Sequence, residues 1–246
     1  MAKTKKPNTK HLPRGLEILY MDEAILVVDK PAGLLTVGTE TNRSKTVYYA
    51  LTDFVRKGNP KSRNRIFIVH RLDRETSGLI VFAKTEDAKF GLQSDWEKTQ
   101  KTYLAVVYGQ LSKKQGTITS YLTENKMFKV YSTDDPTQGK LAHTAYKVLK
   151  ETPHVSLLEV TLLTGRKNQI RVHLADLGHP IVGDKKYGDA KDSYRRLALH
   201  ANTLIFNHPV TGKSMTFESA MPKDFKRLLS IKAQANSTEA DEDVDE

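Results

Sequence analysis

The most informative segment of this chain is His70-Arg71-Leu72-Asp73-Arg74-Glu75-Thr76-Ser77-Gly78, which separates two apolar runs. The runs, 66–69 and 79–83, contain β-branched side chains and have the length that is typical of buried strands. We therefore predict a tight polar loop at the edge of a sheet, with Asp73 held among cations. Taken alone, this loop has two interpretations: Asp73 pairs with Arg71 or Arg74 and fixes a turn, or it takes part in chemistry.

The charge of the chain is uneven. At pH 7 the 246 residues carry a formal net charge of +10, although residues 237–246 contain six acids and no Lys or Arg. Residues 1–236 therefore carry +16. Because Lys and Arg side chains near a phosphate release condensed counterions, this charge predicts a polyanionic partner, a class that includes RNA, membranes and heparin-like ligands.

Composition excludes several classes of protein. The chain has no Cys, which excludes disulfides, zinc–cysteine sites and thiol catalysis. It contains no apolar run near the roughly 20 residues that span a bilayer, and its basic N-terminus lacks the apolar core of a signal peptide. We therefore expect a cytoplasmic protein without a membrane partner. With 38% hydrophobic residues, the chain is long enough for one sizeable core.

The sequence divides into three parts. Residues 1–15 contain five basic residues, two prolines and no acid, which predicts a disordered basic arm, with a merely solubilising tail as the alternative. Residues 16–235 are expected to form the folded domain. Residues 236–246 are expected to form a disordered acidic tail.

The folded part contains signals for both helices and strands. Helical spacing of apolar residues, the N-cap residue Thr85 and helix-ending glycines indicate helices at 46–57, 86–98, 168–177 and 224–233. Apolar runs indicate two strands within 16–29 and others at 102–108, 117–122, 144–149, 155–163, 199–206 and 214–217. Strands in runs with irregularly placed helices favour an α+β fold with a mixed, largely antiparallel sheet.

The loop at 70–78 resembles the catalytic loop of the RluA-type family of RNA pseudouridine synthases, which isomerise uridine in structured RNA. Other segments are similar to later and earlier blocks of this family, in the same order. They are 27–34 (VVDKPAGL), 101–108 (KTYLAVVY), 165–174 (GRKNQIRVHL), 178–184 (GHPIVGD) and 197–201 (LALHA). The resemblance implies a pseudouridine synthase catalytic domain over 16–235, with helices and loops around a central cleft, in a short form that lacks the extra N-terminal RNA-binding domain.

The resemblance also assigns roles to residues. It implies that Asp73 is the catalytic carboxylate, that Arg171 pairs with it, and that Tyr103 stacks on the target base and takes part in proton transfer. A guanidinium beside an aspartate favours the ionised form and orients it. We therefore expect Asp73 and Arg171 to lie within roughly 4 Å of each other at the floor of one cleft. The candidates for substrate binding are His70, Arg71, Arg74, Arg166, Ile170 and Leu174. For Ile170 and Leu174, core packing is an equally good interpretation.

One departure from the family pattern lies close to these residues. The usual string after Gly-Arg is Thr-His, whereas this chain has Lys167-Asn168. Arg171 still aligns, but any role of the family's histidine is not carried over.

Other functions fit the sequence less well. The eight histidines are scattered and form no His-x-x-x-His pair with an adjacent acid, which argues against a metal hydrolase. Asp73 and Glu75 lie two residues apart in one loop, an awkward arrangement for the opposed acids of a glycosidase. A non-catalytic RNA-binding or ribosome-assembly protein shares the charge, yet binding alone does not require the acid, tyrosine and arginine blocks together.

The implied reaction has few other requirements. Isomerisation of uridine includes no redox or phosphoryl step, so we expect no metal and no other cofactor. We expect a monomer that acts on large-subunit rRNA or tRNA stem-loops and extrudes the target uridine at a cost of about a few kcal/mol. The cations expected to hold the flanking RNA are Arg63, Arg65, Arg71, Arg74, Lys167, Lys185, Lys186, Arg195 and Arg196.

Overall fold

The computed structural model describes residues 12–38, 42–59 and 61–230. Their strands are β1 (Glu17–Met21), β2 (Ile25–Lys30), β3 (Phe67–Ile68), β4 (Ser77–Ala83), β5 (Gln100–Tyr108), β6 (Gln115–Glu124), β7 (Val130–Thr133), β8 (Lys140–Glu151), β9 (Val155–Leu162), β10 (Leu199–Asn207) and β11 (Ser214–Glu218). Their helices are α1 (Val47–Arg56), α2 (Glu86–Ser94), the 3₁₀ turn η1 (Trp96–Lys98), α3 (Gln169–Asp176) and α4 (Lys223–Leu228).

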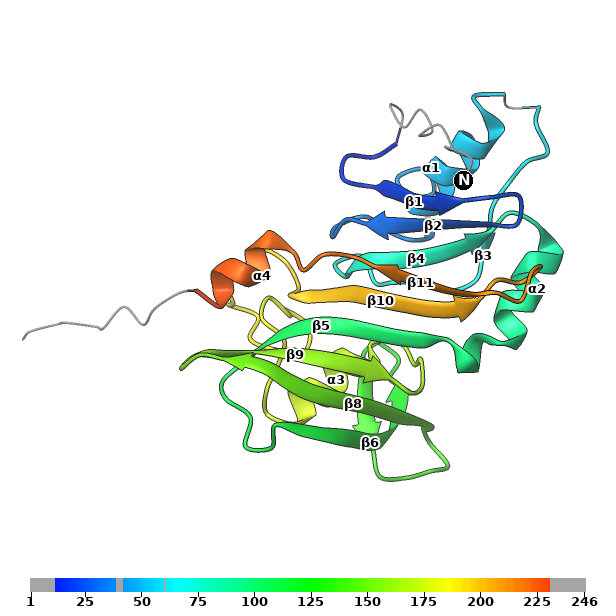
Figure 1. The fold of residues 1–246 in the computed structure, drawn as a ribbon. Helices are drawn as coiled ribbons and strands as arrows, with labels where there is room; N and C mark the ends of the chain where they lie inside the picture. The colour runs from blue at the N-terminus through cyan, green and yellow to red at the C-terminus, as the bar shows by residue number, and fades with distance from the viewer. Residues whose placement is uncertain (1–11, 39–41, 60, 231–246) are drawn as a thin grey trace, which may run out of the picture.

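These strands form one continuous sheet (Figure 1). Its order is β1-β2-β4-β10-β5-β9-β8-β6-β7, with β3 beside β4 and β11 beside β10. Neighbouring strands are antiparallel except for β4 and β10, which are parallel. The predicted α+β class with a mixed, largely antiparallel sheet is therefore confirmed.

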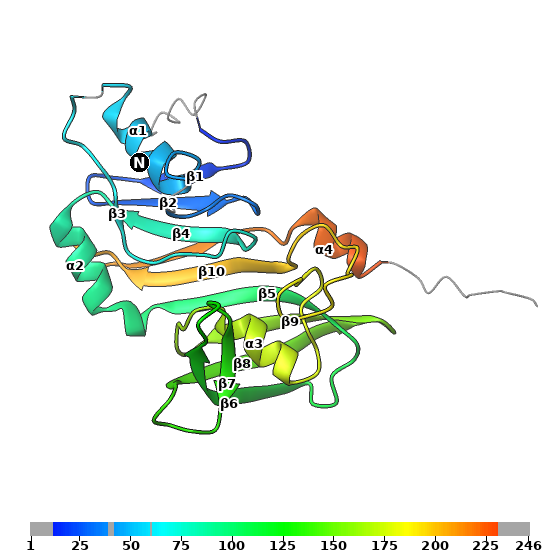
Figure 2. The same cartoon turned by 180° about the vertical axis from the view of Figure 1, so that it is seen from behind.

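Two apolar clusters cover the two faces of the sheet around β2 and β4. In β2, Leu26 and Val28 belong to the larger core, whereas Ile25 and Val27 face the smaller one. Burial on both faces explains why β2 and β4 appear in the sequence as continuous apolar runs rather than alternating ones. Figure 2 shows α1 and α3 in front of the sheet, on the side of the larger core.

The helices begin where the sequence signals place them. Thr85 caps α2, as predicted, because its hydroxyl accepts a hydrogen bond from the amide of Ala88 at 3.1 Å. Thr46 caps α1 in the same way through Tyr49. The helix predicted over 86–98 is split into α2 and η1. Of the helix predicted over 224–233, α4 ends at Leu228 and the next two residues form a turn, while 231–233 lie outside the described residues.

The joint between β4 and β10 brings two distant segments close together. Gly78, the last residue of the polar segment, has φ of +110°, and an added Cβ would lie 2.2 Å from the carbonyl oxygen of Ala201. A glycine is therefore required at this position, because any side chain would push β10 away from the end of the loop.

Most of the two predicted tails lies outside the described residues, since 1–11 and 231–246 are not among them. Of the predicted arm, residues 12–15 are described. Leu12 packs against the larger core, and the carbonyl of Pro13 accepts a hydrogen bond from the amide of Leu16 at 3.0 Å. The described part of the predicted arm thus contacts the folded domain.

Candidate active site

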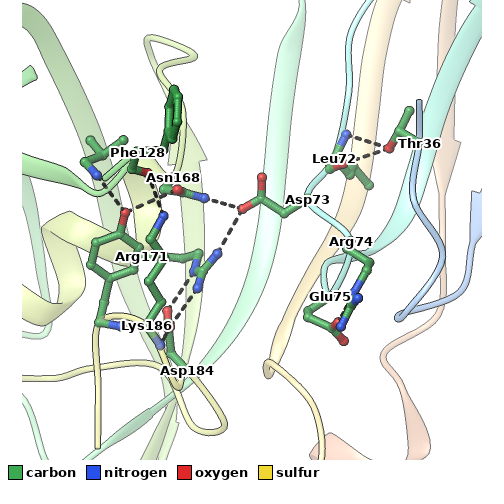
Figure 3. A network of polar contacts seen from close by, with 12 residues as sticks. Thr36, Leu72, Asp73, Arg74, Glu75, Phe128, Asn168, Arg171, Asp184 and Lys186 are labelled. Carbon is green, nitrogen blue, oxygen red and sulfur yellow. Dashed lines mark hydrogen bonds and ion pairs between the residues drawn. The ribbon is translucent and has the colours of Figure 1, made fainter. Parts of the chain in front are cut away.

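Asp73 and Arg171 meet although 98 positions separate them in the chain. Asp73 lies in the loop between β3 and β4, and Arg171 lies in the first turn of α3. The guanidinium Nη1 is 3.2 Å from Asp73 Oδ2, so the predicted contact is confirmed. Figure 3 shows the Asp73 side chain directed away from its own loop toward α3.

Arg171 is itself held by a second carboxylate. Its Nε and Nη2 donate to Asp184 Oδ2 and Oδ1 at 2.7 and 2.8 Å. Asp184 is buried, and Arg171 is largely so. Burial lowers the pKa of Arg171, but the hydrogen bonds and charges of Asp184 and Asp73 outweigh it and raise the pKa above the ordinary value. The guanidinium is thus a fixed cation with one N–H group directed at Asp73.

Asn168 is a second donor to the same carboxylate oxygen. Its Nδ2 donates to Asp73 Oδ2 at 2.6 Å, and its Oδ1 accepts a hydrogen bond from the Tyr187 hydroxyl at 3.2 Å. In the sequence, Asn168 stands out only as a departure from the family string, and neither Tyr187 nor Asp184 was predicted as a site residue. The sequence signal for Asn168 was its place in the family string, where His is usual. An amide, like an imidazole, can donate a hydrogen bond to a carboxylate.

The Asp73 loop is fixed on its other side by the segment that follows β2. Lys30 Nζ donates to the carbonyls of Pro31, Leu34 and Arg74 at 2.9, 2.9 and 3.1 Å. Burial lowers the pKa of Lys30 to about 7, against the opposing effect of nearby acids. These bonds tie the backbone on the C-terminal side of Asp73 to β2.

A threonine fixes the N-terminal side of the loop. The Thr36 hydroxyl donates to the carbonyl of Leu72 at 2.7 Å and accepts from its amide at 3.3 Å, as Figure 3 also shows. The backbone is therefore clamped immediately before and after Asp73, which leaves its side chain as the part that reaches out of the loop.

A cleft of about 320 Å³ opens in front of Asp73. Tyr103, which is buried, forms part of its wall, as expected. Burial raises the pKa of the Tyr103 phenol, and the charge of Asp73 adds to this effect. Ile170 lines the cleft as well, and the exposed Arg71 and Arg166 lie at its rim.

Comparison with known proteins agrees with this arrangement. Residues 24–176 match the sequence model of the family described as RNA pseudouridylate synthase. The chain belongs to this family. It is therefore an RNA pseudouridine synthase, an isomerase, and the alternative of a non-catalytic RNA-binding protein is not supported.

Similar proteins cover most of the chain. An uncharacterized RNA pseudouridine synthase of Bacillus subtilis, YhcT, is 38% identical over 217 residues, which are 87% of this chain and 71% of that protein. Ribosomal large subunit pseudouridine synthase D of Pseudomonas aeruginosa is 38% identical over 239 residues, or 89% of this chain and 72% of that protein. The solved structure of human RNA pseudouridylate synthase domain containing 4 has a TM-score of 0.73 at 26% identity and covers 89% of this chain and 92% of that one.

His70 lines the cleft of the synthase but is held by the protein. Its Nε2 accepts a hydrogen bond from the Val81 amide at 3.1 Å, and its ring lies 4.5 Å from that of Trp96. Burial lowers the pKa of His70 to about 3, helped by the charge of Lys101. The imidazole is therefore held neutral in this structure, with its Nε2 occupied by a backbone amide.

Two predicted substrate-binding residues lie elsewhere. Leu174 is fully buried in the larger core and does not line the cleft, so its prediction as a pocket residue is wrong. The helical spacing that pairs it with Ile170 places both on one side of α3, but Leu174 lies one turn further into the core. Arg74 also lies outside the cleft lining, because its Nε donates to Glu75 at 2.7 Å on the exposed side of the loop.

Some of the predicted flanking cations are already engaged. Arg196 is partly buried, and it donates to the Ser77 hydroxyl at 2.9 Å and lies 3.4 Å from Asp224. Lys167 pairs with Glu124. Arg196 is therefore a structural residue of the β4 end rather than a free surface charge.

The part of the chain that the structure describes contains neither a candidate metal-binding cluster nor a helix able to span a membrane. Within it, no group of three His, Cys, Asp or Glu side chains has the geometry to hold a metal ion. Within the same part, no helix has the length and apolar character needed to cross a membrane.

Proposed function

We propose that the synthase converts uridine to pseudouridine in large-subunit rRNA and that Asp73 is its catalytic carboxylate. One observation carries the assignment. Asp73 Oδ2 accepts from both Asn168 and Arg171, while Oδ1 has no hydrogen-bond partner among the described residues. A carboxylate held by one oxygen and open at the other is suited to react with a substrate in the cleft.

The reaction breaks the bond between the anomeric carbon and N1 of uracil, rotates the base, and joins the same carbon to C5. In balance, N1 gains a proton and C5 loses one. Arg171 donates to the Asp73 carboxylate and orients it while these bonds change. Because the Tyr103 phenol has a raised pKa, it retains its proton, which suits stacking and proton donation better than proton abstraction.

The cleft has the size of a single-nucleotide site. A volume of about 320 Å³ lies at the lower end of small-ligand pockets, which agrees with one extruded uridine rather than a duplex. Arg71 and Arg166 at its rim supply positive charge for the phosphates that flank the extruded nucleotide. The names of several relatives, which refer to the large ribosomal subunit, favour rRNA over tRNA as the substrate.

The decisive experiment replaces Asp73 by Asn, which keeps the shape and removes the charge. We expect Asp73→Asn to abolish conversion of uridine while RNA affinity stays near that of wild type. Glu75→Gln is the matched control, because Glu75 is a partly exposed acid of the same loop that pairs with Arg74. Near-normal conversion by Asp73→Asn, or equal loss in both variants, would contradict the assignment.

The substrate is tested separately by mapping pseudouridine with carbodiimide-dependent reverse-transcription stops. RNA from cells with and without the gene is compared, and we expect a stop to disappear from large-subunit rRNA. Loss of a stop from tRNA alone would replace rRNA by tRNA as the substrate.

We also propose that residues 16–235 work as one catalytic domain, in the cytoplasm and as a monomer. Light scattering on the purified full chain, with and without RNA, measures the oligomeric state. A stable dimer would contradict the last part of this proposal.

A further inference from the structure

Asn168 occupies an unusual position at the start of α3. It is the N-cap residue, but its side chain makes no capping hydrogen bond to the helix. Its backbone is left-handed, with φ of +53°, a conformation that Asn adopts more readily than most residues. Asparagine is favoured at N-caps because its side chain can accept from the first amides of the helix. Here the amide group is directed at Asp73 instead (Figure 3).

Tyr187 determines which way the Asn168 amide points. The Tyr187 hydroxyl accepts a hydrogen bond from the Val130 amide at 3.2 Å, so its single proton is free to be donated to Asn168 Oδ1. With its oxygen occupied by that proton, Asn168 presents its NH₂ group to Asp73. The reversed amide would place an oxygen 2.6 Å from a carboxylate oxygen, which is repulsive.

The same short turn holds both donors to Asp73. The amide of Tyr187 donates to Asp184 Oδ1 at 3.1 Å, and Asp184 holds the guanidinium of Arg171. The Arg171 guanidinium lies over the Tyr187 ring, 5.0 Å from its centroid. Segment 184–187 therefore orients Arg171 through a carboxylate and Asn168 through a phenol.

We propose that Asn168, oriented by Tyr187, is a positioning residue that fixes the rotation of the Asp73 carboxylate and so selects Oδ1 as the oxygen that reacts. Two donors converge on Oδ2 from the N-terminal end of α3, the neutral amide of Asn168 at the N-cap and the charged Arg171 in the first turn. Arg171 alone provides a single hydrogen bond to the carboxylate and leaves rotation about its last bond open. The amide of Asn168 adds the second point of contact, and it donates its proton at every pH at which the protein is folded.

This proposal rests on the proposed function, and single-turnover conversion of an RNA fragment tests both. Asn168→Gly removes the amide and suits the left-handed backbone. We expect it to slow conversion by about tenfold to a hundredfold, because this is the effect of losing one hydrogen bond to a charged group. RNA affinity should be unchanged. Asn168→His supplies an N–H donor at the same position, and His also tolerates this backbone, so it should recover most of the rate.

Tyr187→Phe is the second variant. It removes the hydroxyl and keeps the ring beneath Arg171, so it should slow the wild-type enzyme by less than Asn168→Gly does. It should have no further effect in the Asn168→Gly background, because the two residues act in series. If Asn168→Gly does not fold, which a melting curve shows, Tyr187→Phe in the wild-type background still tests the proposal.

Three results would overturn the proposal: a wild-type rate for Asn168→Gly, no recovery with Asn168→His, or a Tyr187→Phe effect of equal size in both backgrounds. A wild-type chain that converts no uridine would instead count against the proposed function. Wild-type conversion with unaffected variants would count against the positioning role alone.

Discussion

Replacing Asp184 by Asn should damage both stability and catalysis, although Asp184 does not line the cleft. Its Oδ2 accepts from Arg171 Nε, and its Oδ1 accepts from Arg171 Nη2 and from the amides of Lys186 and Tyr187. In Asp184→Asn, an NH₂ group replaces one of these oxygens and faces a donor. The charge of the largely buried Arg171 then lacks its main partner.

The size of the effect follows from this burial. Breaking one partner of a buried pair costs about 3 to 5 kcal/mol, because the remaining charge stays desolvated. For a domain of this length each kcal/mol lowers Tm by about 2 to 4 °C, so the expected fall is about 6 to 20 °C. Conversion measured well below the lowered Tm should also be slow, because the guanidinium is no longer held toward Asp73.

Thermal unfolding and single-turnover conversion are the two measurements. Asp189→Asn is the matched control, since Asp189 is exposed in the same region and accepts a hydrogen bond from the amide of Lys191. It should leave both quantities unchanged. A Tm for Asp184→Asn within the error of the wild-type value would refute this reasoning. It would show that Arg171 loses little stabilisation when the charge of Asp184 is removed.

Four further variants test other parts of the structure. Tyr103→Phe should slow conversion severely with a smaller loss of RNA affinity, because the ring still stacks; an unchanged rate would make the residue a core residue only. Gly78→Ala should prevent stable folding or lower Tm steeply, because its Cβ would lie 2.2 Å from the Ala201 carbonyl oxygen; a normal melting curve would contradict that close approach. Arg166→Gln should reduce the slope of log affinity against log salt by about 1, and an unchanged slope would remove this residue from the RNA surface. Burial lowers the pKa of Lys30 to about 7, so between about pH 7 and pH 10 the unfolded chain binds more protons and the free energy of unfolding rises with pH. Lys30→Met should flatten this rise in urea titrations, and an equal rise in both proteins would contradict it.

Local sequence signals gave most of the secondary structure. The predicted strands and helices correspond to elements of the structure because each has its own apolar pattern and a cap or glycine at its end. The strand β7 was not predicted. It has four residues, and it follows a turn in which Phe128 adopts a left-handed φ of +58° without a glycine to signal it.

Contacts between segments far apart in the sequence were harder to predict. The pairing of Asp73 with Arg171 came from the resemblance, whereas the resemblance placed no role on Asp184 or Tyr187. Asn168 reaches Asp73 only because α3 begins with a left-handed residue, which cannot be deduced from residue types alone. Leu174 was misplaced because helical spacing defines a side of a helix but not how far along that side the cleft extends.

The parallel ladder between β4 and β10 has a mechanical consequence. It consists of two residue pairs, His200 with Ser77 and Ala201 with Gly78. It joins the part of the sheet next to the Asp73 loop to the part that carries Tyr103 and packs against α3, the helix of Arg171. The reactive groups therefore lie on both sides of this short ladder. A shear of one half of the sheet past the other would disengage the carboxylate from its donors while both halves kept their own hydrogen bonds. The rate of turnover should therefore depend on how well the two parts of the sheet are aligned. An RNA that contacts both parts would stabilise that alignment.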